Sequence, residues 1–233
     1  MVTQISCLLA VVLFGLVSVE AVKLSIVNRC GYTVWPGAIP GGGVRLDPGQ
    51  SWNLDIPAGT QATRFWARTG CNFDGSGRGS CVTGDCGNMK NCQVSGAPPT
   101  TLAEITFGRN GVGDSLDYLD ISLVDGFNVP MSIQPTNNQN RCQPGGRGPT
   151  CAANINAQCP QELRVPQGCD SACTKFGGDL YCCRGQYTDN CPPTKYSRFF
   201  KQQCPDAYSY AKDDQTSTFT CPAGTNYDVV MCP

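Results

Sequence analysis

Three carboxylates interrupt apolar segments of this sequence and are the side chains best suited to chemistry. Glu104, Asp120 and Asp125 stand among apolar residues typical of strands. Paired carboxylates act as acid, base or nucleophile in glycoside hydrolysis, and they accept hydrogen bonds from sugar hydroxyls. Because Asp120 and Asp125 differ by an odd number of positions, an unbroken strand would place them on opposite faces. A bulge or the turn at Asp125-Gly126 is needed to bring them together.

Simpler interpretations of these residues stay open from the sequence alone. Asp125 is also typical of a turn, and Glu104 and Asp120 fit the solvated face of a strand. Arg68 fits an ordinary surface ion pair.

The composition excludes several classes of function. The 233 residues include no histidine, which rules out Ser-His-Asp and Cys-His catalysis and imidazole metal ligands. The 17 basic residues are matched by 18 acidic ones, which argues against a nucleic-acid partner. The 17 cysteines indicate an exported chain with disulfides rather than a zinc protein. No metal or other cofactor is implied.

The odd number of cysteines is explained by an N-terminal signal peptide. The run from Cys7 to Val19 is apolar and of signal-peptide length, and Val19-Glu20-Ala21 forms a passable cleavage site. We therefore predict a signal peptide over residues 1–21, whose removal takes away Cys7 and leaves an even number. A buried N-terminal helix, the alternative, would leave Cys7 unpaired. No other apolar stretch is long enough to cross a bilayer, so we expect a secreted protein without a transmembrane segment.

The remaining sequence predicts a mainly β fold. Short alternating segments are separated by Gly- and Pro-rich turns, and the only helical fragment that stands out is short, around Ser197–Gln203. The predicted strands are 23–27, 51–56, 64–68, 101–107, 119–124, 128–133, 216–220 and 227–231. Many short strands indicate a sandwich or a barrel.

Two cysteine-rich segments, 71–92 and 151–204, hold too little apolar surface to fold without cross-links. We therefore expect two disulfide-braced lobes beside the β core. The pairing of the cysteines stays open at this point, except that the neighbours Cys182 and Cys183 should have different partners, because a bridge between adjacent residues is strained.

Several motifs occur in one order along the chain. They include Gly77-Arg-Gly-Ser-Cys81-Val-Thr-Gly-Asp-Cys86, Phe65-Trp-Ala-Arg-Thr-Gly-Cys71, Thr101-Leu-Ala-Glu104, Asp120-Ile-Ser-Leu-Val-Asp-Gly-Phe127 and Cys204-Pro-Asp-Ala-Tyr-Ser-Tyr210. In these motifs the sequence resembles the thaumatin-like, or pathogenesis-related group 5, proteins of plants. It departs from them at Asn88, where glycine is common, and in a longer insert at Phe107–Ser115.

The resemblance implies a thaumatin-like β-sandwich core with two disulfide-rich lobes, eight disulfides and a cleft between the sandwich and the larger lobe. The core would comprise residues 22–68, 100–152 and 205–233, the small lobe 69–99 and the larger lobe 153–204. The implied bridges are Cys30–Cys232, Cys71–Cys81, Cys86–Cys92, Cys142–Cys221, Cys151–Cys204, Cys159–Cys169, Cys173–Cys182 and Cys183–Cys191.

The resemblance also implies an acidic cleft. Its members would be Arg68, Glu104, Asp120, Asp125 and Asp213, the last preferred over Asp214. The aromatic residues Phe127, Tyr208 and Tyr210 are candidates for stacking on sugar rings, with core packing as the alternative.

The implied function is that of an extracellular (apoplastic), monomeric, antifungal plant defence protein. Its cleft would bind fungal β-1,3-glucan, and the protein would perturb walls or membranes. One alternative is a weak endo-β-1,3-glucanase with Glu104 as general acid and Asp120 or Asp125 as nucleophile or base. The other is a protein-directed inhibitor. We favour binding over hydrolysis, and note that stable secreted proteins of this kind are often allergens.

Overall fold

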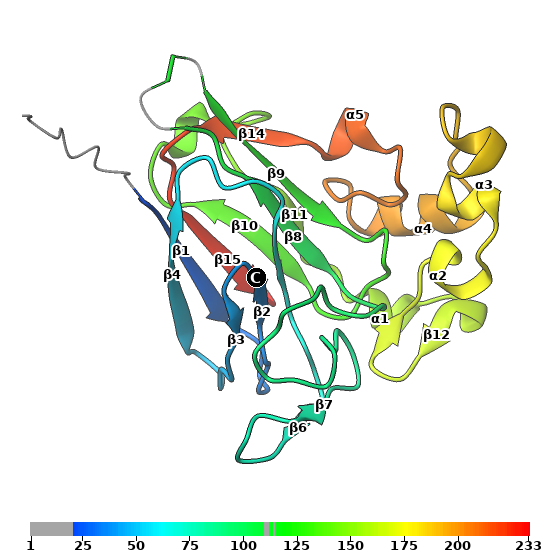
Figure 1. Cartoon of the computed structure of the whole chain (residues 1–233). Coiled ribbons are helices and arrows are strands. Elements are labelled where there is room, and N and C mark those ends of the chain that lie inside the picture. The colour runs from blue at the N-terminus through cyan, green and yellow to red at the C-terminus, as the bar shows by residue number, and fades with distance from the viewer. Residues whose placement is uncertain (1–20, 110–111, 114) are drawn as a thin grey trace, which may run out of the picture.

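The alternating segments form two β-sheets in the computed structural model, which describes residues 21–109, 112–113 and 115–233 (Figure 1). The five-stranded sheet has the order β11 (Thr150–Cys151), β10 (Met131–Pro135), β15 (Tyr227–Met231), β1 (Ala21–Asn28) and β4 (Ser51–Pro57). The six-stranded sheet has the order β14 (Phe219–Pro222), β9 (Leu116–Ser122), β8 (Leu102–Thr106), β5 (Thr63–Trp66), β2 (Gly37–Ile39) and β3 (Gly42–Gly43). The predicted β-sandwich is confirmed.

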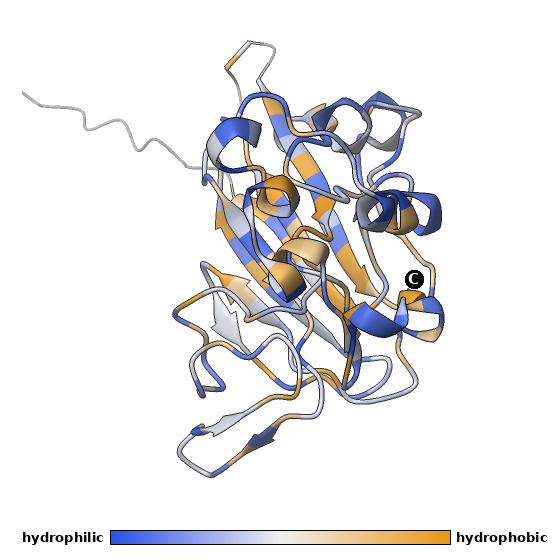
Figure 2. Ribbon diagram, turned by 90° about the vertical axis from the view of Figure 1, so that its right-hand side faces the viewer, coloured by the Kyte–Doolittle hydropathy of each residue, from blue (hydrophilic) through white to orange (hydrophobic). Residues whose placement is uncertain are grey.

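Side-chain alternation along the strands builds the core between the sheets. In β1, Val22, Leu24 and Ile26 are buried while the residues between them are more exposed. Figure 2 shows the matching bands of apolar and polar residues along the strands. A parallel pairing of β1 with β15 brings the two ends of the described chain together. The core therefore depends on contacts between residues that are far apart in sequence.

Two lobes project from the sandwich, below it and to its right in Figure 1. The small lobe carries β6 (Asn72–Phe73) and β7 (Gly79–Ser80). The larger lobe carries α1 (Ile155–Gln158), β12 (Arg164–Val165), β13 (Gly168–Cys169), α2 (Ala172–Phe176), α3 (Asp179–Cys182) and α4 (Lys195–Gln203). Short 3-10 turns lie at Gln139–Arg141, Gln161–Leu163 and Gly185–Tyr187. We keep 69–99 and 153–204 as working limits of the lobes.

The local predictions are confirmed except at several strand ends: of the predicted strand 128–133 only 131–133 belong to β10, and 67–68 and 123–124 lie beyond the ends of β5 and β9. The predicted helix around Ser197–Gln203 is α4, which a capping box at Thr194 extends to Lys195. The predicted strand 216–220 is wrong in its first half, because α5 (Asp214–Ser217) occupies it. Ser217 Oγ donates to the carbonyl of Asp213, which holds this helical turn closed.

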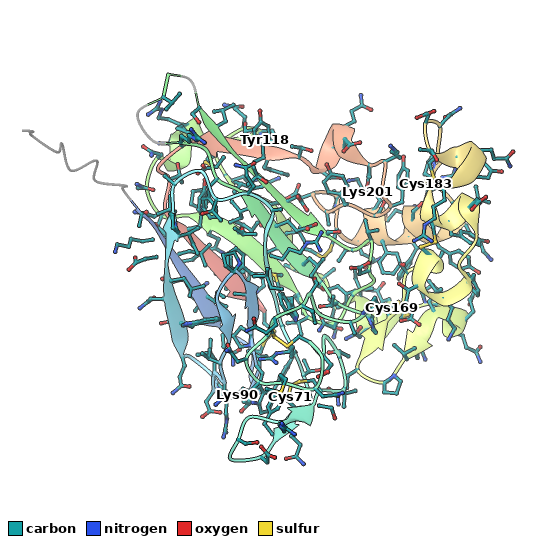
Figure 3. The ribbon with its side chains drawn as sticks, viewed as in Figure 1. Cys71, Lys90, Tyr118, Cys169, Cys183 and Lys201 are labelled. Atoms are coloured by element: carbon teal, nitrogen blue, oxygen red, sulfur yellow. A yellow bond between two sulfur atoms is a disulfide. The ribbon has the colours of Figure 1, made fainter. Side chains whose placement is uncertain are left out.

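All eight bridges implied by the family resemblance are present. Cys182 joins Cys173 and Cys183 joins Cys191, so the two neighbours take different partners, as the strain argument required. Figure 3 labels Cys71 in the small lobe and Cys169 and Cys183 in the larger one. The cross-links therefore hold the two segments that have little core of their own.

Two of the sequence predictions fall partly on residues that the structure does not describe. Of the predicted signal peptide, residues 1–20 lie outside the described residues, and Ala21 begins β1. Of the predicted insert Phe107–Ser115, residues 110, 111 and 114 lie outside them. No helix in the described ranges combines the length and the apolar character needed to cross a bilayer.

One polar contact crosses the apolar core. Tyr227 on β15 donates its hydroxyl to Oδ2 of Asp117 on β9 at 2.6 Å, which links the two sheets. The backbone N–H of Gly108 donates to Oδ1 of the same carboxyl at 2.7 Å. Asp117 is fully buried, and burial raises its pKa to about 6 although both hydrogen bonds oppose the shift.

We predict that Asp117 makes stability depend on pH. A carboxyl whose pKa rises on folding stabilises the native state fully below its ordinary pKa of 3.8, and this contribution is lost as the pH rises through about 6. Relative to Asp117→Asn, the free energy of unfolding of the parent should therefore fall by about 3 kcal/mol from a pH well below 3.8 to one well above 6. Urea unfolding with intact disulfides measures it, and parallel pH curves for the two proteins would contradict the prediction.

Candidate functional site: an acidic cleft

Three neighbouring strands place a charged row on the outer face of the six-stranded sheet. In the strand register Arg64 on β5 lies opposite Glu104 on β8, and Glu104 lies opposite Asp120 on β9. Directly opposed residues have side chains within contact distance of each other. Arg64 Nε donates to Oε1 of Glu104 at 2.7 Å. The sheet register therefore brings together carboxylates that are separated in sequence.

A tight turn after β9 brings Asp125 to the same place. The N–H of Gly126 donates to the carbonyl of Leu123 at 2.9 Å, and Gly126 has a φ of +94°. A Cβ atom at Gly126 would lie 2.6 Å from the carbonyl oxygen of Cys169, so only glycine fits between β9 and the larger lobe. The predicted turn at Asp125-Gly126 is confirmed. Because the strand ends before this turn, Asp125 can lie on the same side of the sheet as Asp120 despite their odd spacing in sequence.

These side chains line a cavity of about 310 Å³. Its lining residues are Arg64, Leu102, Glu104, Asp120, Ser122, Val124, Asp125, Tyr208 and Ala211. We call it the acidic cleft. The wall of the cleft at Tyr208 is fixed to the end of β9 by two backbone hydrogen bonds of 2.8 Å. The N–H of Tyr208 donates to the carbonyl of Ile121, and the N–H of Leu123 donates to the carbonyl of Tyr208. An adjoining pocket shares Val124 with the cleft and reaches the larger lobe at Tyr181.

The electrostatics of the cleft favour a protonated Asp120. Burial raises the pKa of Asp120 to about 8, the nearby Glu104 carboxylate adds to this effect, and Arg64 opposes it. Burial also raises the pKa of Asp125. Among the described residues, the buried Oδ1 of Asp120 has no hydrogen-bond partner. At neutral pH Asp120 can therefore donate a hydrogen bond as well as accept one.

Arg68 does not lie in the cleft, and this prediction is corrected. Its side chain is fully buried, and it donates to the carbonyls of Trp35 at 2.8 Å, Met89 at 2.9 Å and Lys90 at 2.7 Å. These contacts tie the small lobe to the core. The arginine of the cleft is Arg64, which is exposed between the buried Thr63 and Phe65. The alternation of side chains along this strand was the signal in the sequence that could have identified it.

Asp213 also lies outside the lining of the cleft. It pairs with Lys201 at 3.0 Å and accepts hydrogen bonds from the N–H and Oγ of Ser209. Its neighbour Asp214 accepts a hydrogen bond from the hydroxyl of Tyr208 at 2.9 Å, and its charge contributes to the raised pKa of Asp120. Asp214 is absent from the lining as well, so of these two acids Asp214 acts on the cleft only through its charge and its contact with Tyr208, whereas the predicted Asp213 is engaged by Lys201 and Ser209.

The three aromatic residues predicted to stack on sugar rings lie in different environments. Phe127 is fully buried and its backbone pairs with that of Cys169, so core packing is its role and stacking is excluded. Tyr208 lines the cleft, and Tyr210 lines the adjoining pocket. In the part of the chain that the structure describes, no group of three or more His, Cys, Asp or Glu residues is arranged to hold a metal ion.

Comparison with known proteins agrees with the family resemblance of the sequence. The model of the thaumatin family matches residues 28–233, and the chain belongs to this family. It is 59% identical over 214 residues to pathogenesis-related thaumatin-like protein 3.7 of Cryptomeria japonica, and the aligned residues cover 91% of this chain and 89% of the relative. It is 58% identical over 212 residues to pathogenesis-related 5 protein Jun a 3.0101 of Juniperus ashei, covering 91% and 88%. It is 56% identical over 210 residues to an alpha-amylase/trypsin inhibitor of Zea mays, covering 90% and 98%.

We predict that Arg68 acts in stability. Replacing it in Arg68→Met leaves buried carbonyls without their charged donor, and should lower the free energy of unfolding by about 3 kcal/mol or more. Arg64→Gln is the matched control, because the Arg64 side chain is 45% exposed and its loss should cost less than about 1 kcal/mol. Guanidinium unfolding with intact disulfides makes the comparison. Equal stability of the two variants would show that Arg68 has no structural role.

Proposed function

We propose that this thaumatin-like pathogenesis-related protein is a defence protein whose acidic cleft binds an uncharged β-1,3-glucan of fungal walls. The observation that carries the proposal is the row of Arg64, Glu104 and Asp120 on the floor of a cavity of about 310 Å³. The family resemblance supplies the choice of glucan and of fungi.

The mixture of donors and acceptors in the cleft suits a sugar. Each sugar hydroxyl both donates and accepts. Arg64 offers donors, Glu104 and Asp125 offer acceptors, and a protonated Asp120 offers both. A polyanion would be repelled by the carboxylates, and the near balance of 17 basic and 18 acidic residues gives the chain no net positive charge to attract one.

Secretion is part of the same proposal. Eight disulfides form and persist in an oxidising compartment, and the small lobe and larger lobe depend on them. We therefore place the protein outside the cell, in the apoplast.

We predict that Glu104→Ala weakens binding of laminarin at least about fivefold, because one charge-assisted hydrogen bond to the sugar is lost. Titration calorimetry measures the affinity, and thermal unfolding should barely change. Asp55→Ala is the matched control, since Asp55 is an exposed carboxylate on β4 that also pairs with a basic residue, Lys23. Parent-like affinity in Glu104→Ala would remove the cleft from the proposal.

Hydrolysis is tested in the same preparation by release of reducing sugar from β-1,3-glucan. In a hydrolase with this geometry Asp120 would be the general acid, since its pKa is raised to about 8, and Glu104 would be the base or nucleophile. This assignment differs from the predicted one, in which Glu104 is the acid. The binding proposal expects no release. Release that disappears in Asp120→Asn would replace it with the hydrolase.

We further predict that glucan binding weakens as the pH rises through about 8. Above the raised pKa of Asp120 the carboxyl loses its proton, which removes a donor and adds a negative charge beside Glu104. Asp120→Asn keeps a donor and cannot titrate, so its affinity should be flat over the same range. A parent with a flat profile would contradict the prediction.

A protein-directed function is the second candidate, because a relative at 56% identity is named as an alpha-amylase/trypsin inhibitor. Assays of α-amylase and trypsin with the glucan-tested preparation separate the two. Inhibition without glucan binding would favour the second candidate, and glucan binding that Glu104→Ala weakens would favour the first.

A further inference from the structure

The outer face of the six-stranded sheet continues beyond the acidic cleft. Tyr118 precedes Asp120 by two positions on β9, so both side chains point to the same face of the sheet. Two residues of a strand span roughly 7 Å, which puts Tyr118 at the next position outward from the cleft. Figure 3 labels Tyr118 beside β14, on the side of the molecule away from Cys71.

Tyr118 is not needed to build the core. Tyr118 is 51% exposed, whereas its neighbours Asp117 and Leu119 are buried between the sheets. A single exposed aromatic residue is common on protein surfaces and by itself indicates nothing. The position is what matters here, because the ring continues the row of cleft residues along β9.

The strands on both sides of Tyr118 add hydroxyl groups without charge. Thr106 on β8 and Thr220 on β14 are its register partners, so the three side chains form one row across the sheet. On β8 this row follows Glu104 by two positions, just as Tyr118 is two positions from Asp120. A charged row and a neutral aromatic row therefore lie side by side.

We propose that Tyr118, flanked by Thr106 and Thr220, is a second subsite for the same uncharged polysaccharide. The apolar face of one sugar unit stacks on the exposed ring, and its hydroxyls bond to the threonines. The chain runs on from there to the units held by Glu104 and Asp120. This inference rests on the proposed binding of glucan in the acidic cleft.

The row fits a sugar better than a protein partner. A stable protein interface buries about 800 Å² on each side around a cluster of apolar anchors. Next to Tyr118 on the same face of β9 the apolar surface is limited to Leu116, which is 38% exposed. One aromatic ring between two hydroxyl-bearing residues is enough for a single sugar unit.

The test is a series of β-1,3-linked oligosaccharides, from the disaccharide up to laminarin, measured by titration calorimetry on the parent and on Tyr118→Ala. Long oligosaccharides, which reach both rows, should bind Tyr118→Ala about three- to tenfold more weakly. The disaccharide, which fills the acidic cleft alone, should bind both proteins equally. Tyr118→Phe should bind like the parent, because stacking needs the ring and not the hydroxyl.

Tyr32→Ala is the matched control, since Tyr32 is also exposed, at 48%, but lies beside Cys232 rather than on β9. It should leave every affinity unchanged. If the parent binds no oligosaccharide, the proposed function fails. If the parent binds and Tyr118→Ala matches it at every length, or loses affinity equally at every length, the second subsite is overturned while the cleft stands.

Discussion

The hydrogen bond from Tyr227 to the buried carboxyl of Asp117 fixes which face of β9 meets the cleft. Side chains alternate along a strand, so with Asp117, Leu119 and Ile121 directed into the core, Tyr118 and Asp120 must point outward. A slip of one residue in the pairing of β9 would expose the inner set and bury the outer one. The contact of Asp117 with Tyr227, together with the buried Leu119 and Ile121, therefore holds the register on which the charged row depends.

The strand register positions the floor of the cleft, and the disulfides help to position its walls. The bridge between Cys151 and Cys204 anchors the chain just before the segment that carries Tyr208. The bridge between Cys159 and Cys169 anchors the residue whose carbonyl oxygen packs against Gly126. Leu163 and Phe200 of the larger lobe and Ala207 beside Tyr208 also pack into the main core, so these walls are held both by packing and by the cross-links. The cross-links add stability by restricting the unfolded chain.

The sequence predicted the strands because alternation and turn residues are local signals, and it predicted Glu104, Asp120 and Asp125 because charges inside apolar strands are conspicuous. It did not predict the pairing of the cysteines, which followed from the family resemblance, since strain separated only Cys182 from Cys183. Arg68 was misplaced because no sequence pattern shows that backbone carbonyls will compensate a buried guanidinium. Tyr118 was missed because the predicted strand began at Leu119, whereas β9 begins at Leu116.

The arrangement of charges in the cleft also bears on whether it binds or cleaves. Oε1 of Glu104 is engaged by Arg64, so only its other oxygen is available to a ligand or to water. Asp120 carries its proton at neutral pH, which removes one of the three negative charges that would otherwise repel one another around a single arginine. Such a cleft carries less negative charge than three ionised carboxylates would give it, and it is rich in fixed donors and acceptors. The proposed glucan would lose its hydration on entering a site of this kind but would regain hydrogen bonds of both types, which agrees with the proposed binding.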